Sequence, residues 1–240
     1  MRPEAIAVLI PAHNEEGLLP RALAAVNAAA RHPALAELRV LTVVAADACV
    51  DDTAEVARRA GADVLHLESR NPGRARAVAA QHAMAALGAP ADVTWLASTD
   101  ADSAVPHDWL AFQLSQARAG WAAVVGTVTV THWPPVPELA DRHRRLYNAS
   151  RPARGLPWRH PHVHGANLGV AADAYRQVGG FPSLLSGEDH ALVSALELGG
   201  HRVLRTPACP VETSSRLHPR AVGGFGDDLA RLATRTGPVG

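Results

Sequence analysis

Two carboxylates, Asp100 and Asp102, follow an apolar run near the middle of the chain. The run, Val93–Ala97, has the composition of a short buried strand, and residues 98–103 form the turn that leaves its C-terminal end. Aspartates separated by one residue in an extended turn can point the same way. Proteins often hold Mg²⁺ or Mn²⁺ with one or two carboxylates and the phosphates of a substrate. The pair therefore suggests a site for a metal diphosphate, with an ordinary solvated turn as the alternative.

Three more predicted strands are followed by residues that could bind a ligand. They are Ala5–Ile10, before Pro11, Asn14 and Glu15; Val40–Ala46, before Asp47; and Val64–Leu67, before the basic segment from Arg70 to Arg76. The carboxyl ends of parallel strands share one edge of a sheet, and ligands bind in the crevice at that edge. We therefore expect these residues to face the same crevice as Asp100 and Asp102.

Helical patterns alternate with the strands. Asn14 is the expected N-cap of the first helix, which runs to about Arg31. Later helices are expected at 51–60, 72–87, 108–118, 138–148, 173–178, 187–198 and 227–234, and later strands at 122–130 and 203–205. This alternation predicts an α/β fold with a single doubly wound, mostly parallel sheet and helices on both faces. We expect residues 1–240 to form one domain.

The pattern is interrupted between residues 131 and 164, where Pro, Arg and His are frequent and the 138–148 helix is the one regular element expected. We interpret this segment as an insertion or lid over the crevice. His160, His162 and His164 alternate, so in an extended segment they share a face. A structural zinc or hydrolase site is the alternative use of these three histidines.

Composition limits the classes of partner and location. The 23 basic residues, all arginine, balance 23 acidic ones, so overall charge does not favour nucleic acid. No apolar run has the length of a membrane span, and we expect a cytoplasmic protein, with a membrane-peripheral location left open. Cys49 and Cys209 lie far apart in the sequence, which fits a reducing compartment and excludes a disulfide scaffold.

Seven segments together resemble the nucleotide-sugar glycosyltransferases of family 2, which have the GT-A fold. They are PAHNE at Pro11–Glu15, DACVDDT at Asp47–Thr53, NPGRARA at Asn71–Ala77, TDAD at Thr99–Asp102, HGANLG at His164–Gly169, GGF at Gly179–Phe181 and GEDHAL at Gly187–Leu192. The resemblance covers most of the chain, from about residue 5 to about residue 205. One departure is Ala48-Cys49, where the family usually has Gly-Ser.

The resemblance implies that different parts of the chain have different roles. Residues 1–130 would bind the nucleotide sugar, 131–164 would be the insertion, and 165–240 would form the acceptor side with a C-terminal loop and helix. Asp47 would contact the nucleobase or ribose, Asp100 the ribose, and Asp102 a Mn²⁺ or Mg²⁺ ion that bridges the phosphates. Further donor contacts are expected from Pro11, Asn14, Glu15, Asn167 and Glu188, and from Arg74 or Arg76, whose charge would stabilise the departing diphosphate.

Asp189 would be the general base that removes the proton from the acceptor hydroxyl. In the C-terminal loop, His218 would bind the metal, and Arg216 and Arg220 would hold the diphosphate. First-turn acids at Glu188 and Asp189, and an exposed basic loop around His218, are the structural alternatives.

The leading hypothesis is an inverting, metal-dependent glycosyltransferase that uses a nucleoside-diphosphate sugar. Its acceptor would be a small molecule or a lipid-linked group, chosen by residues 134–164. The alternatives are a retaining enzyme of the same fold, a sugar-1-phosphate nucleotidyltransferase and a non-catalytic nucleotide-sugar binding module. Homodimer formation is left open.

Overall fold

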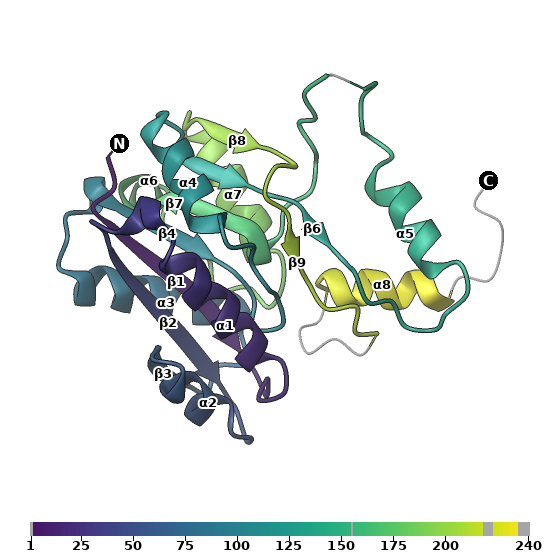
Figure 1. The fold of residues 1–240 in the computed structure, drawn as a ribbon, viewed down its shortest axis with the longest axis horizontal. Helices are drawn as coiled ribbons and strands as arrows, with labels where there is room; N and C mark the ends of the chain where they lie inside the picture. The colour runs from purple at the N-terminus through teal and green to yellow at the C-terminus, as the bar shows by residue number, and fades with distance from the viewer. Residues whose placement is uncertain (1, 155, 218–222, 235–240) are drawn as a thin grey trace.

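A computed structural model describes residues 2–154, 156–217 and 223–234. Within these residues, seven strands form one sheet in the order β3-β2-β1-β4-β7-β5-β8, and β6 and β9 form a small second sheet (Figure 1). The strands are β1 Ala5–Ala12, β2 Arg39–Asp47, β3 Asp63–Leu67, β4 Thr94–Ser98, β5 Ala123–Val125, β6 Val128–Thr129, β7 Leu168–Ala171, β8 Val203–Arg205 and β9 Val211–Glu212.

Helices cover both faces of the large sheet. They are α1 Leu19–Ala30, α2 Thr53–Arg59, α3 Pro72–Leu87, α4 Trp109–Arg118, α5 Leu139–Tyr147, α6 Ala172–Gln177, α7 Glu188–Leu198 and α8 Phe225–Thr234, with short 3-10 turns η1 Pro33–Leu35, η2 Ala91–Val93 and η3 Gly165–Asn167. In Figure 1, α1 and α4 lie in front of the sheet, whereas α3 and α7 lie behind it. The predicted doubly wound α/β fold is confirmed.

The strand order reverses between β1 and β4. β1 pairs in parallel with β2 on one side and with β4 on the other, while β2 continues to β3. β7 enters antiparallel between β4 and β5. Such a reversal separates the loops that follow β1 and β4, which leaves a crevice at their carboxyl ends.

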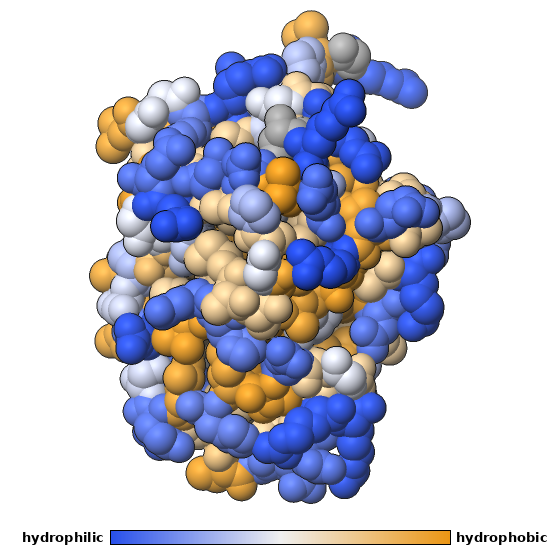
Figure 2. All heavy atoms as spheres, turned by 90° about the vertical axis from the view of Figure 1, so that its left-hand side faces the viewer, coloured by the Kyte–Doolittle hydropathy of each residue, from blue (hydrophilic) through white to orange (hydrophobic). Residues whose placement is uncertain are grey.

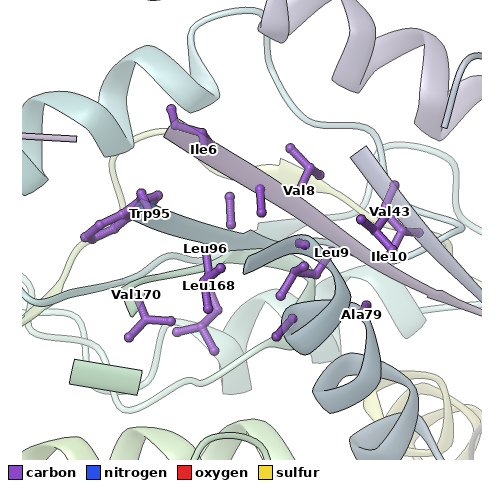
Figure 3. Close-up of a cluster of buried hydrophobic side chains, with 14 of the residues drawn as sticks. Ile6, Val8, Leu9, Ile10, Val43, Ala79, Trp95, Leu96, Leu168 and Val170 are labelled. Atoms are coloured by element: carbon purple, nitrogen blue, oxygen red, sulfur yellow. The ribbon is translucent and has the colours of Figure 1, made fainter. Parts of the chain in front are cut away.

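The sheet is buried on both faces, which explains its continuous apolar runs. Every side chain of β1 from Ala5 to Ile10 is fully buried. Figure 3 shows Ile6 and Val8 on one side of the sheet, and Leu9 and Leu96 on the side where α3 contributes Ala79. Because successive side chains alternate across a strand, helices on both faces require apolar residues at every position.

Two local predictions are wrong. Asn14 does not cap α1, which begins at Leu19. Asn14 instead has a left-handed φ of 53° and accepts a hydrogen bond from the Val50 N–H through its side chain, at 2.8 Å. Its polar group is thereby committed to the loop after β2, and a turn precedes the helix.

The strand expected at residues 122–130 is divided. It forms β5 in the large sheet and β6 in the small one, because the chain bends at Gly126, whose N–H donates to the Asn167 carbonyl at 2.9 Å. A Cβ at Gly126 would lie 2.7 Å from Asn167 Oδ1, so the close approach requires glycine. Strand β9, the partner of β6, was not predicted; a two-residue strand has too little periodicity to recognise.

The predicted helix in the insertion is confirmed as α5. It lies on the right of Figure 1, away from the large sheet, and packs against α8. The opposite end of the molecule, turned towards the viewer in Figure 2, carries both kinds of side chain, with hydrophobic ones gathered across the middle of the view and hydrophilic ones mostly around them. No helix in the described part of the chain is long and apolar enough to cross a membrane.

Candidate active site

A cleft of about 760 Å³ opens at the carboxyl ends of β1, β2 and β4. The predicted site residues that line it are Pro11, Glu15, Asp47, Arg76, Asp100, Asp102, Glu188, Asp189 and Arg216. The cleft thus brings together groups from three strand-and-loop junctions, from α3 and α7, and from the loop before α8. Three predicted residues, Asn14, Arg74 and Asn167, do not line it. His218 and Arg220 lie outside the described residues.

Asp47 ends β2 and organises the loop that follows β3. Its Oδ1 accepts from the backbone N–H groups of Ser69 and Arg70 at 2.6 and 3.0 Å. Its Oδ2 accepts from the Ser69 hydroxyl and the Asn71 N–H, both at 2.8 Å. Burial alone would raise the pKa of Asp47, but these hydrogen bonds lower it below its ordinary value. A carboxylate held in this way gives the cleft a fixed negative charge.

Arg76 joins β4 to α7. The guanidinium is buried, and it pairs with the carboxylates of Asp100 and Glu188 and donates to the Ser98 hydroxyl at 3.1 Å. Burial alone would lower the pKa of Arg76, but the nearby carboxylates raise it. A Cβ at Gly165 would lie 2.7 Å from Arg76 Cζ, so only glycine lets the chain pass over this ion pair.

Asp100 lies among several acids. Burial, with the charges of Asp102, Glu188 and Asp189, raises the pKa of Asp100 to about 6 although Arg76 opposes the shift. A carboxyl group in a cleft whose pKa is shifted by burial and by neighbouring charges is a candidate functional group.

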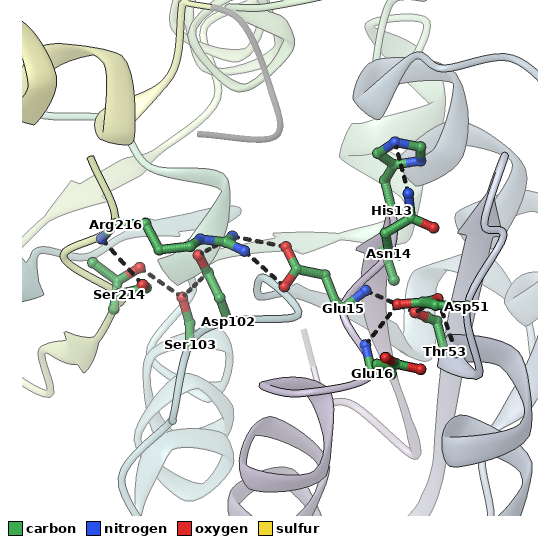
Figure 4. Close-up of polar contacts among 12 residues, drawn as sticks. His13, Asn14, Glu15, Glu16, Asp51, Thr53, Asp102, Ser103, Ser214 and Arg216 are labelled. Atoms are coloured by element: carbon green, nitrogen blue, oxygen red, sulfur yellow. Dashed lines mark hydrogen bonds and ion pairs between the residues drawn. The ribbon is translucent and has the colours of Figure 1, made fainter. Parts of the chain in front are cut away.

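Arg216 lies between two acids of the cleft (Figure 4). Its Nη1 and Nη2 donate to the Glu15 carboxylate at 2.9 and 2.7 Å, and Nη2 also donates to Asp102 Oδ2 at 2.7 Å. Burial alone would lower the pKa of Arg216, but the hydrogen bonds to Glu15 and the charge of Asp102 raise it. The guanidinium of Arg216 therefore attaches the C-terminal loop to the ends of the strands.

Asp189 lies in the first turn of α7, which starts after Gly187 in a left-handed conformation (φ 77°). Its Oδ1 accepts from the His190 N–H and its Oδ2 from the Gly165 N–H, both at 2.8 Å. These two backbone donors fix the carboxylate at the wall of the cleft. A carboxylate oxygen has further lone pairs, so the geometry allows Asp189 to accept a proton from a bound hydroxyl.

The three predicted residues outside the cleft have other partners or lie at the surface. Asn167 is buried, accepts from Trp109 Nε1 at 2.9 Å and donates to the carbonyls of Thr127 and Cys209 at 2.9 and 3.1 Å. Its amide is thereby committed to joining the two sheets. Arg74 is exposed on α3. The positions of Asn14, Arg74 and Asn167 do not support the substrate contacts predicted for them.

The donor set around Asp102 suits a hard divalent cation. The described residues contain no cluster of three or more His, Cys, Asp or Glu side chains that could hold a metal alone. Asp100, Asp102 and Glu15 nevertheless present carboxylate oxygens to one cleft, and a guanidinium already lies beside two of them. This arrangement fits Mg²⁺ or Mn²⁺ held by one or two carboxylates together with the phosphates of a substrate.

Comparison with known proteins gives a family that fits this site. The model of Glycosyl transferase family 2 matches residues 7–179. The chain belongs to glycosyltransferase family 2. The match contains the strand ends that carry Asp47, Asp100 and Asp102, and it ends before Asp189 and Arg216. No curated protein sequence matches the chain.

Solved structures with the same GT-A fold have low sequence identity to this family 2 chain. Against the mannosyltransferase PcManGT from Pyrobaculum calidifontis, in complex with GDP-Man and Mn²⁺, the TM-score is 0.65 at 22% identity over 88% of this chain and 57% of that one. Against S. aureus TarS 1-349 in complex with UDP-GlcNAc, the TM-score is 0.63 at 18% identity over 95% and 65%.

A third similar structure is the glucosyl-3-phosphoglycerate synthase from Mycobacterium tuberculosis in complex with Mn²⁺, UDP and phosphoglyceric acid. Its TM-score is 0.54 at 18% identity over 96% of this chain and 75% of that one. The chain spans less than two thirds of the first two neighbours. The likeness therefore establishes the fold of this glycosyltransferase family 2 chain.

Sequence reasoning missed the residues that the insertion brings to the cleft. His164 lines it and lies with its Nε2 at 3.0 Å from the Tyr147 hydroxyl, which accepts from the Val128 N–H at 3.0 Å. Burial, with the neighbouring histidines, lowers the pKa of His164 to about 3, so the ring is neutral. His162 stacks on Tyr147 with ring centroids 3.8 Å apart. The alternation of His160, His162 and His164 was the available signal, and in the structure these rings pack against Tyr147, Trp158 and one another.

His13 also lines the cleft and was not predicted as a site residue. Its Nδ1–H donates to the Asp47 carbonyl at 2.7 Å, which ties the end of β1 to the end of β2. Its place inside the PAHNE segment could have identified it.

Proposed function

We propose that this chain transfers a sugar from a nucleoside-diphosphate sugar to an acceptor hydroxyl, with inversion and with a divalent metal. The observation that carries the proposal is the shared cleft. Asp47, Asp100 and Asp102 line it from the strand ends, and Asp189 lines it from the start of α7. A single displacement needs a leaving-group site and a base on the acceptor side, and no nucleophile from the protein.

In the proposed reaction, Asp189 accepts the proton of the acceptor hydroxyl as its oxygen bonds to the anomeric carbon. The bond between that carbon and the diphosphate oxygen breaks, and its electron pair leaves with the nucleoside diphosphate. The Gly165 and His190 N–H groups keep the Asp189 carboxylate oriented. Its orientation does not depend on the acceptor, so little reorganisation is needed during the reaction.

Asp102 would hold the metal together with the donor phosphates, with Glu15 or Asp100 as the nearest further carboxylates. When bound, the metal would neutralise charge that develops on the leaving diphosphate. Arg216 would then exchange its contacts with Asp102 for contacts with a phosphate, which a guanidinium can bind through two parallel N–H groups. Neighbours solved with Mn²⁺ and with GDP-Man, UDP-GlcNAc or UDP support a nucleotide-sugar donor and a metal.

The test combines binding and turnover. UDP and GDP, each with and without Mn²⁺, are added in a thermal-shift measurement to find the nucleotide, because a ligand that binds only the native state raises the melting temperature. Corresponding sugar nucleotides are then assayed with a panel of alkyl glycosides with short and long alkyl chains, and the anomeric configuration of the product is determined by NMR.

Asp189→Asn should keep the nucleotide-dependent thermal shift and lose transfer by roughly 10²–10⁴-fold, the usual contribution of a general base. The matched control is Asp173→Asn, because Asp173 also lies in the first turn of a helix and accepts from the next residue's N–H, at 2.7 Å. Full transfer by Asp189→Asn would refute its role as base, and a product that retains the donor configuration would refute single displacement.

A further inference from the structure

The insertion is the cationic part of a chain that is neutral overall. Residues 131–164 contain six of the 23 arginines and only two of the 23 acids. The remaining sequence therefore carries the opposite net charge. Such an uneven distribution gives one end of the molecule a local positive field that the total charge conceals.

Most of these arginines point outwards. Arg142 is turned inwards, since its side chain is 13% exposed and bonds to Glu138 and to the Leu232 carbonyl. The other five are exposed: Arg144, Arg145, Arg151, Arg154 and Arg159. Glu138 is paired with Arg142, and Asp141, 3.5 Å from Arg144, offsets one of the exposed arginines. With six arginines and two acids, the segment keeps a net positive charge.

Exposed leucines accompany the arginines. Leu146 and Leu156 in the insertion are 46% and 64% exposed, and Leu185, which lines the cleft, is 65% exposed. Two contacts connect the Leu185 loop to α5, which carries Leu146: the Ser186 hydroxyl donates to the Gly223 carbonyl at 3.0 Å just before α8, and α8 packs against α5. We call the exposed arginines named above, with Leu146, Leu156 and Leu185, the basic rim; of these residues, Leu185 lines the cleft.

We propose that the basic rim docks on the surface of an anionic lipid bilayer. Arginines beside exposed leucines match such a surface, because the guanidinium groups contact lipid phosphates while the leucines enter the boundary of the acyl chains. RNA or an acidic polysaccharide would account for the arginines but not for the leucines. An apolar protein partner would account for the leucines but not for the arginines.

Docking would hold the cleft mouth next to the bilayer through Leu185. An acceptor hydroxyl carried by a lipid could then reach Asp189 without the lipid leaving the membrane; this consequence rests on the proposed function. The docking itself does not, and it can be measured without any substrate.

The experiment is sedimentation of the full chain with vesicles. The protein is mixed with vesicles of phosphatidylglycerol and phosphatidylcholine, or with phosphatidylcholine alone, at low and high salt. We expect binding to the anionic vesicles that weakens at high salt. Arg144→Glu with Arg145→Glu should lower the partition coefficient about 25-fold or more, because each arginine near such a surface contributes about fivefold.

Matched controls come from the other side of the molecule. Arg58 and Arg59 are adjacent exposed arginines on α2 with an acid, Glu55, one turn earlier, as Asp141 precedes Arg144. Arg58→Glu with Arg59→Glu therefore makes the same charge change away from the rim. Leu146→Ser should also weaken binding to the anionic vesicles, and its control is Leu198→Ser, at a residue that is 90% exposed at the end of α7.

The melting temperature of each variant shows whether it is folded. The proposal is overturned if wild type binds both vesicle types equally or not at all, or if the α2 pair weakens binding as much as the α5 pair. It is also overturned if the α5 pair changes binding to a single-stranded RNA and leaves vesicle binding unaltered.

Discussion

On one side of the cleft, acids lie at or just beyond the ends of buried strands; on the other, they belong to a short helix and its loops. Asp47 and Asp102 are on the strand side, fixed by the register of β1, β2 and β4. Asp189 is on the helix side, oriented by two backbone N–H groups. The contrast teaches that the strand side derives its geometry from the core, whereas the helix side depends on contacts between distant segments.

Arg76 connects the two sides, and its replacement should have the largest effect on stability. Arg76→Leu leaves Glu188 buried without its cation, and removing one partner of a buried ion pair costs about 3–5 kcal/mol. The free energy of unfolding, from urea denaturation, measures this loss. The control is Arg74→Leu, two residues earlier on the same helix at an exposed position, where we expect a change below about 0.5 kcal/mol.

A second variant covers the case in which Arg76→Leu does not fold. Changing Arg76 and Glu188 together to Leu removes both charges, and much of the lost stability should return. Equal destabilisation by Arg74→Leu and Arg76→Leu would show that Arg76 does not link the two sides.

The strand side could be predicted from the sequence, and the helix side only in part. Asp100 and Asp102 follow an apolar run that has the length and composition of a buried strand. Their position at the edge of the sheet could therefore be predicted. Arg74 and Arg76 could not be separated, because α3 is rich in alanine on all sides and has no clear apolar stripe to show which arginine faces inwards.

The contacts of the insertion could not be predicted because they join residues distant in sequence. Tyr147 bonds to His164 and to Val128 across three different segments, and no local pattern encodes those distances. For Asn167 the local motif predicted a role that the distant contacts do not support. Its motif suggested ligand binding, but its side-chain amide forms hydrogen bonds that join the two sheets.

Asp102→Asn and Asp189→Asn should show that the two sides of the cleft have different functions. On the strand side, loss of this carboxylate should weaken Mn²⁺-dependent nucleotide binding by at least about tenfold, or about 1.4 kcal/mol. Asp189→Asn, on the helix side, should leave that binding unchanged. Isothermal titration of the nucleotide with and without Mn²⁺ measures both.

Asp92→Asn, at an exposed acid that does not line the cleft, controls for a change in net charge. If Asp102→Asn binds nucleotide and Mn²⁺ as wild type does, the metal is held elsewhere. If Asp189→Asn weakens binding as much as Asp102→Asn, the two sides do not have separate roles.

The smallest expected effect concerns the pH dependence of stability in the insertion, where His143 lies on α5. Burial, with the charge of His162, lowers the pKa of His143 to about 4, whereas an unfolded histidine titrates near 6.5. Below pH 6.5 the unfolded chain therefore binds a proton that the folded chain does not, and stability falls as the pH drops towards 4.

His143→Phe removes this contribution while keeping a ring against Trp133, Tyr147 and Phe225. Urea denaturation at pH 7 and pH 5 should show that the variant loses about 1 kcal/mol less than wild type between the two values. The same substitution at His82, a partly exposed histidine beside Asp63, should leave the loss as it is in wild type. An equal effect at both positions would mean that burial of His143 is not the cause.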